Sequence, residues 1–85
     1  MANQRRIFKV AQRIRQLVAE ELNRVADPRF HLVTITSAVV SPDMRHAKVY
    51  WMVSGQKERI PEVEEAFLSA EGLFRRILAK GLGIR

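Results

Sequence analysis

The sequence predicts a single small α+β domain built from a helix, a two-stranded hairpin and a second helical segment. Its 85 residues leave room for one domain only. Apolar residues recur every three or four positions in the first and last thirds of the chain, whereas β-branched residues are concentrated in the middle. Hydrophobic residues make up 47% and charged residues 28%, a balance typical of a folded domain rather than of a disordered tail.

The first segment, about residues 5–25, is predicted to be a long amphipathic helix. Its apolar residues repeat at helical spacing: Ile7, Val10, Ala11, Ile14, Leu17, Val18, Leu22 and Val25. A second face carries polar residues at the same spacing: Arg6, Lys9, Arg13, Gln16 and Glu20. The helix should end before Asp27-Pro28, because Pro28 has no N–H and disfavours the α region at the preceding residue.

Two strands follow, over residues 32–40 and 45–53, and form a hairpin. Residues 41–44 predict a β-turn, because Pro42 fixes φ at its second position. In the first strand, alternation places Val33, Ile35 and Val39 on one face and Leu32, Thr34, Thr36, Ala38 and Val40 on the other. In the second strand it separates apolar Ala47, Val49, Trp51 and Val53 from His46, Lys48, Tyr50 and Met52. Core packing is the expected role of Trp51.

The last helix is predicted to begin near Pro61 and to run to about residue 80, where Gly81 and Gly83 end it. Gly72 lies inside this run, at a position where glycine costs about 1 kcal/mol relative to alanine. Spacing alone leaves two explanations open: a kink, or a helix that packs tightly on the sheet.

The basic residues are concentrated at the two ends of the chain. The formal net charge is +6, and residues 1–24 and 72–85 each carry +4, whereas residues 25–71 carry −2. If both ends fold onto one face, that face attracts a polyanion, either nucleic acid or anionic lipid. The candidate phosphate-binding residues are Arg5, Arg6, Lys9 and Arg13, then Arg75, Arg76 and Lys80, and finally Arg45 and Lys48 on the hairpin. A membrane-surface role is disfavoured, because the apolar face of the first helix is needed to cover the hairpin.

Nothing in the sequence predicts an enzyme, a cofactor or a metal site. The chain has no cysteine, and His31 and His46 lack carboxylates at metal-ligand spacing. There is no G-x-S-x-G motif and no Gly-rich phosphate loop. No apolar run approaches the roughly 18 to 20 residues of a membrane span, and the N-terminus lacks the apolar region of a secretory signal. We therefore expect a soluble, cytoplasmic binding protein without a small-molecule substrate.

The order of several short motifs resembles the ribosome-binding factor A family. These motifs are the basic first helix, Asp27-Pro28-Arg29, the Thr-Ile-Thr strand, Ser41-Pro42-Asp43, Ala47-Lys48-Val49-Tyr50 and Ser69-Ala70-Glu71-Gly72 followed by Leu73-Phe74-Arg75-Arg76. The resemblance implies a type II KH-like fold, with Ala70 and Gly72 marking a kink between two later helices. It also implies a monomeric assembly factor that binds the 30S ribosomal subunit and its 16S rRNA and assists 5′-end processing. On this basis residues 1–85 are expected to form one KH-like RNA- or ribosome-binding domain.

The chain departs from the family at its C-terminus. The family pattern continues into a third strand, whereas this sequence stops at Gly83-Ile84-Arg85, about where that strand should begin. We therefore expect a shortened chain or an unusually short member, an open sheet edge, and poorly fixed residues 82–85. The alternative function is a protein-interaction module that docks a partner through its helix face or open sheet edge, with RNA binding incidental.

Overall fold

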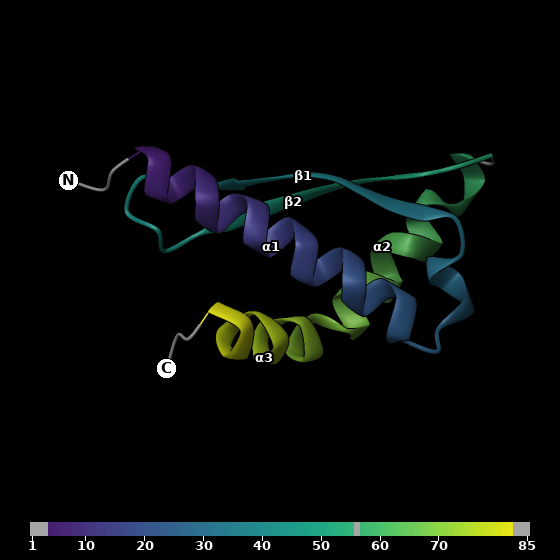
Figure 1. Cartoon of the computed structure of the whole chain (residues 1–85). Helices are drawn as coiled ribbons and strands as arrows, with labels where there is room; N and C mark the ends of the chain where they lie inside the picture. Colours follow the sequence, from purple (N-terminus) through teal and green to yellow (C-terminus); the bar gives the residue numbers. More distant parts are fainter. Residues whose placement is uncertain (1–3, 56, 83–85) are drawn as a thin grey trace.

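The computed structural model describes residues 4–55 and 57–82. Three α-helices and a two-stranded sheet form the domain, with two short 3₁₀ helices in the connections (Figure 1). In chain order the elements are α1 (Gln4–Arg24), η1 (Pro28–Phe30), β1 (Val33–Val40), β2 (Ala47–Val53), η2 (Lys57–Arg59), α2 (Ile60–Ser69) and α3 (Glu71–Leu82). The predicted α+β class and the helix–hairpin–helix order are confirmed.

α1 is the element on which the rest of the domain is assembled. Ile14, Leu17 and Val18 are buried, because the apolar stripe of α1 packs against β1 on one side and α3 on the other. The start of α1 and the end of α3 lie at the same end of the molecule, on the left in Figure 1. The helix ends at Arg24, close to the predicted boundary before Asp27-Pro28.

β1 and β2 are antiparallel, and β1 contains a bulge that the alternation pattern did not predict. Ile35 pairs with Trp51 and Ser37 pairs with Tyr50, so Thr36 is the extra residue. An inserted residue reverses which side chains point to the core beyond it. The prediction that Val39 shares the face of Ile35 is therefore wrong: Val39 is 54% exposed, whereas its neighbour Val40 is 8% exposed.

The connection between the strands is a hydrogen-bonded turn, as its sequence predicts. The Met44 N–H donates to the Ser41 carbonyl at 2.8 Å, and the Ser41 hydroxyl donates to Asp43 at 2.6 Å. The backbone N–H of Arg45 also donates to Asp43, at 3.0 Å. The His46 N–H donates to the Ser41 hydroxyl at 3.0 Å. Residues 45 and 46 are thus engaged in the turn, and β2 begins at Ala47 rather than at the predicted Arg45.

The helical segment after the hairpin is divided at Ala70. There the backbone adopts φ −95° and ψ 6°, α2 ends at Ser69 and α3 begins at Glu71. Gly72 lies within the first turn of α3 and does not have positive φ. Of the two residues expected to mark the interruption, Ala70 therefore occupies it and Gly72 follows it.

Gly81 is a point of close approach between α1 and α3. A Cβ atom built on Gly81 would lie 2.6 Å from Leu17 Cδ1, so the absence of a side chain lets the two helices meet. The prediction that Gly81 ends the helix is wrong, because α3 continues through it to Leu82. Leu82 also packs against the core, contrary to the expectation that residues 82–85 are poorly fixed. The rest of that segment, residues 83–85, lies outside the described residues, so the expected absence of a third strand is not tested.

The two glycines of α3 should respond oppositely to alanine. We expect Gly81→Ala to lower the free energy of unfolding by about 1–3 kcal/mol, because the new methyl group displaces Leu17. Gly72→Ala should raise it by up to about 1 kcal/mol, because a Cβ there meets nothing within 4 Å and alanine favours a helix. Urea unfolding of both variants tests this pair. Equal shifts of the two midpoints would contradict the close approach at Gly81.

The core joins the helices to the sheet through aromatic contacts. Phe67 is the common neighbour, with ring centroids 4.8 Å from Phe30, 5.8 Å from Phe74 and 5.5 Å from Trp51. Trp51 is half-buried and packs against the core cluster, which confirms its predicted packing role. None of the helices within the described ranges is both long and apolar enough to cross a membrane.

Candidate nucleic-acid interface

α1 carries a row of exposed basic side chains on the face that the sheet does not cover. Arg6, Lys9 and Arg13 recur at spacings of three and four, which places them on one side of the helix. Arg5 is exposed one turn before Lys9. The guanidinium of Arg13 donates to Gln16 at 3.1 Å, and Gln16 donates to Glu20 at 3.2 Å, so this part of the surface is held by bonds along the helix.

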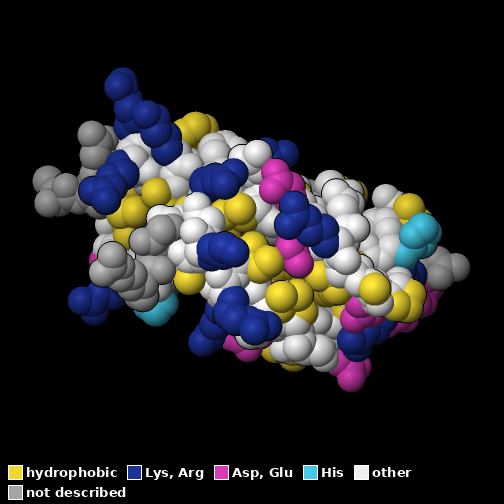
Figure 2. Space-filling model, turned by 60° about the horizontal axis from the view of Figure 1, so that its bottom comes forward, with side chains coloured by type: hydrophobic (Ala, Val, Ile, Leu, Met, Phe, Trp, Pro, Cys, Tyr) yellow, Lys and Arg dark blue, Asp and Glu magenta, His cyan; other side chains and the backbone are white. Residues whose placement is uncertain are grey.

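α3 adds two more exposed cations, Arg76 and Lys80, four residues apart on one face of the helix. The contact between Leu17 and Gly81 places this end of α3 beside the middle of α1. Figure 2 shows most Lys and Arg side chains over the left and central parts of this face, whereas Asp and Glu lie in the centre and toward the right. We call the set Arg5, Arg6, Lys9, Arg13, Arg76 and Lys80 the α1–α3 basic surface.

Three of the predicted phosphate-binding residues lie elsewhere. Arg75 forms an ion pair with Glu71 at 2.7 Å and lines a groove with Trp51 and Phe67, on the β2 side of α3. Lys48 extends from the face of β2 opposite Val49 and Trp51, and Arg45 belongs to the hairpin turn. The nine predicted residues therefore do not form a single surface: six belong to the α1–α3 basic surface and three lie outside it.

Two basic residues with clear positions were missed by the sequence analysis. Arg15 lines a small hollow together with Thr36 and Ser37 at the edge of β1 that faces away from β2. Its place four residues after Ala11, on the flank of the apolar stripe, is the signal that could have found it. Arg59 has a structural role, because its guanidinium donates to the carbonyl oxygens of His31 at 2.7 Å and Arg29 at 3.0 Å.

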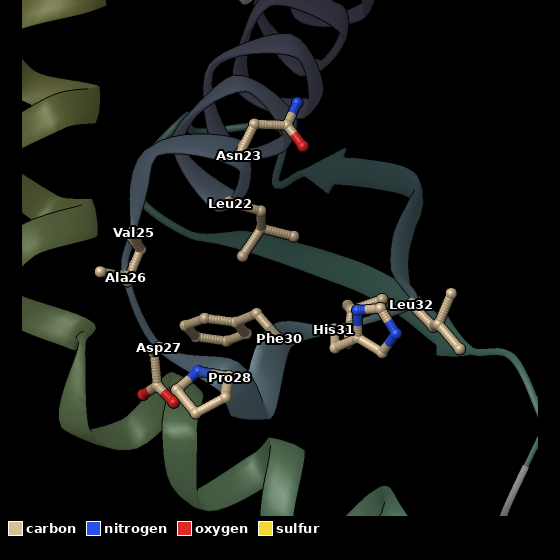
Figure 3. Close-up of a pocket in the computed structure, with 10 residues that line it drawn as sticks. Leu22, Asn23, Val25, Ala26, Asp27, Pro28, Phe30, His31 and Leu32 are labelled. Atoms are coloured by element: carbon tan, nitrogen blue, oxygen red, sulfur yellow. The ribbon is translucent and has the colours of Figure 1, made fainter.

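A hollow beyond the end of α1 has a volume of about 470 Å³. Figure 3 shows Asp27 and His31 on opposite sides of it, with Phe30 and Leu22 between them. Asp27 is already engaged: it accepts the Arg29 backbone N–H at 2.9 Å and the Arg29 guanidinium at 2.8 Å. No group of three or more potential metal ligands occurs in the part of the chain that the structure describes. The hollow therefore offers no acid–base pair or metal site.

Two carboxylates in loops should make the fold sensitive to acid. The Arg29 side chain, and then its backbone N–H, hold the pKa of Asp27 below its usual 3.8. The Ser41 hydroxyl and the Arg45 N–H lower the pKa of Asp43 in the same direction. A carboxyl with a lowered pKa in the folded state stabilises the fold above its unfolded pKa, and this contribution is lost as the pH falls through the folded value.

We therefore expect the thermal midpoint to fall as the pH is lowered from about 5 to about 2. The variant with both Asp27→Asn and Asp43→Asn should have a lower thermal midpoint at about pH 5, and its midpoint should change less as the pH falls. The matched control is Glu64→Gln, which changes an exposed carboxylate of α2 and should keep the wild-type profile. If the thermal midpoint of the double Asn variant fell with pH as steeply as that of the wild type, Asp27 and Asp43 would not be the cause of the acid sensitivity.

Comparison with known proteins adds independent findings. The profile of the family described as ribosome-binding factor A matches residues 6–85. The ribosome-binding factor A of Micrococcus luteus is 41% identical over 86 residues, covering 100% of this chain and 58% of that protein. That of Desulfatibacillum aliphaticivorans is 44% identical over 78 residues, covering 91% and 63%. The chain thus spans roughly half to three fifths of the length of the curated relatives it matches.

A solved structure shares the fold. The crystal structure of ribosome-binding factor A from Thermus thermophilus superposes with a TM-score of 0.74 at 25% sequence identity. The match covers 85% of this chain and 77% of that one.

Proposed function

The chain belongs to the ribosome-binding factor A family, and from this premise we propose that it binds the free 30S ribosomal subunit. There it assists the processing of the 16S rRNA 5′ end and the late maturation of the subunit. Residues 1–85 act as one KH-like RNA- or ribosome-binding domain, as a monomer in the cytoplasm. The family description names a binding factor and not a catalytic activity, so the proposed mechanism is occupancy of the subunit.

The α1–α3 basic surface is the observation that supports this proposal. It combines two helices from opposite ends of the sequence into one cationic face, which is suited to a phosphate backbone. Its exposed Arg and Lys side chains can contact several successive phosphates without reading base sequence. Such a surface positions the protein on folded rRNA, and the structure of the subunit supplies the specificity.

Co-sedimentation with purified ribosomal particles tests the proposal. We expect the chain to pellet with free 30S subunits at low salt, and to pellet with 50S subunits only to the extent that any basic protein does. Equal pelleting with both subunits would contradict a specific role on the small one. Complementation of a strain that lacks its own factor, with the 16S rRNA 5′ end read by primer extension, tests the processing step.

A groove beside the edge of β2 that no described strand pairs with supports the alternative of a protein-interaction module. It is lined by Val49 and Trp51 from β2 and by Phe67, Phe74 and Leu78 from α2 and α3. An extended protein segment could add to this edge and place apolar side chains in the groove. Subunit binding that is insensitive to salt and is lost on Leu68→Glu, an exposed position next to Trp51, would favour this alternative.

A further inference from the structure

The face of the sheet turned away from α1 has no covering element among the described residues. The strand register places Thr34 beside Met52, Ser37 beside Tyr50 and Val39 beside Lys48 on this face. All six side chains are exposed, whereas Ile35 and Val40 on the opposite face are buried in the core. We call these six residues the outer sheet face.

Large apolar and aromatic groups occupy much of this exposed surface. Tyr50 is 49% exposed and Met52 is 54% exposed, and the bulge at Thr36 adds Val39 to the same side. Exposed apolar residues that are scattered singly over a surface need no explanation, whereas several gathered on one face indicate a contact surface. The neighbours of Tyr50 on this face are Ser37, which is small, and Lys48 and Met52, which are flexible. The Tyr50 ring is therefore accessible to a planar ligand.

The charge around the outer sheet face is positive. None of its six residues is acidic, and Lys48 extends from its hairpin end. Arg15 lies at the β1 edge next to Ser37, the strand partner of Tyr50. The nearby Asp43 is in the turn, where the Ser41 hydroxyl and the Arg45 N–H already bond to it. An exposed aromatic ring with one cation two residues before it on the same strand, and another at the edge of the neighbouring strand, fits a nucleobase with adjacent phosphates.

We propose that the outer sheet face binds single-stranded RNA, with one unpaired base stacked on Tyr50 and the flanking phosphates held by Lys48 and Arg15. The proposal rests on the proposed function, because ribosomal RNA would supply the unpaired segment. It adds a second contact that is separate from the α1–α3 basic surface. Stacking on Tyr50 is independent of salt, whereas phosphate binding is not, so the two kinds of contact can be measured apart.

The experiment is fluorescence anisotropy with a labelled ten-nucleotide single-stranded RNA over a salt series. Tyr50→Ala should weaken binding by about 5- to 150-fold, the range for one stacked base, with an unchanged salt slope. Tyr50→Phe should keep the wild-type affinity, because the ring remains. Lys48→Gln should reduce the slope by about 0.7, as expected when one phosphate contact to a single strand is lost.

Leu68→Ala is the matched control, because Leu68 is also an exposed hydrophobic residue but lies on α2, away from the outer sheet face. It should leave RNA affinity unchanged, and thermal unfolding should show that all the variants are folded.

Wild-type affinity in Tyr50→Ala would overturn the proposal, whereas 30S binding through the α1–α3 basic surface could persist. If Tyr50→Ala weakens 30S binding but not binding of the oligonucleotide, the occupant is a ribosomal protein and the proposal is also overturned. Failure of the wild type to bind 30S subunits would reject the proposed function and leave the oligonucleotide result valid.

Discussion

Neutralising the α1–α3 basic surface is expected to remove most of the affinity of this protein for the small ribosomal subunit. The variant carries Lys9→Gln, Arg13→Gln, Arg76→Gln and Lys80→Gln, all at exposed positions. Each phosphate contact to single-stranded RNA contributes about −0.7 to the slope of log affinity against log salt. Four lost contacts should therefore reduce that slope by about 2.8 and weaken binding by about three to four decades at about 50 mM salt.

The wild-type protein should itself show a steep salt dependence. With roughly three to six phosphate contacts, an increase from about 50 to 200 mM salt should weaken binding by about one to two and a half decades. Sedimentation or anisotropy with 30S subunits measures both the wild type and the variant. An affinity that stays flat across this range would remove the electrostatic basis of the proposed function.

Two double variants distinguish the effect of where the cations lie from the effect of net charge on subunit binding. Lys9→Gln with Lys80→Gln removes two cations from the α1–α3 basic surface, whereas Lys57→Gln with Arg75→Gln removes two cations outside it. Both lower the net charge by two, so a general attraction to RNA would weaken equally in both. We expect a loss only in the first. Equal losses would show that net charge, and not this surface, determines binding.

The side of α1 that carries the basic residues could be predicted from the sequence, because helical periodicity is a local property. That α3 lies beside α1 could not be predicted in this way, and a shared basic face was therefore only a condition. The apolar stripe of α1 fixes which side faces the core, and Arg6, Lys9 and Arg13 then fall on an uncovered side. The position of Arg75 could not be predicted in this way. It neighbours Arg76 in sequence, but a helix turns by about 100° per residue, so Arg75 faces β2 and pairs with Glu71 instead.

The bulge at Thr36 escaped prediction for a different reason. Alternation assumes that every residue of a strand pairs, and Thr36 has no property that distinguishes it from Thr34 before the partner strand is known. The interruption at Ala70 was implied by the family resemblance and not by the residue itself, since alanine is the best helix former and does not signal a break. It allows Phe67 on α2 and Phe74 on α3 to contact Phe30 together.

This shared aromatic contact makes Phe74 the residue whose loss should damage the fold most. Phe74 is 8% exposed, and its ring centroid lies 5.8 Å from that of Phe67 and 6.3 Å from that of Phe30. Truncation of a buried phenylalanine removes transfer free energy and leaves a cavity, at a cost of about 3–5 kcal/mol. A domain of this size has a total stability of only about 4–13 kcal/mol, so Phe74→Ala should leave it marginally folded or unfolded at about 37 °C.

Urea unfolding followed by the fluorescence of Trp51 measures this effect, because Trp51 packs against Phe67 in the same cluster. Phe8→Ala is the matched control: it is the same substitution at a residue that is 62% exposed on α1, and it should change the free energy of unfolding by less than about 0.5 kcal/mol. The free energy of unfolding of Phe74→Leu should lie between those of Phe74→Ala and Phe8→Ala, because leucine keeps most of the buried volume. Similar midpoints for Phe74→Ala and Phe8→Ala would mean that α3 does not depend on the aromatic cluster. The α1–α3 basic surface would then need another element to hold Arg76 and Lys80 beside α1.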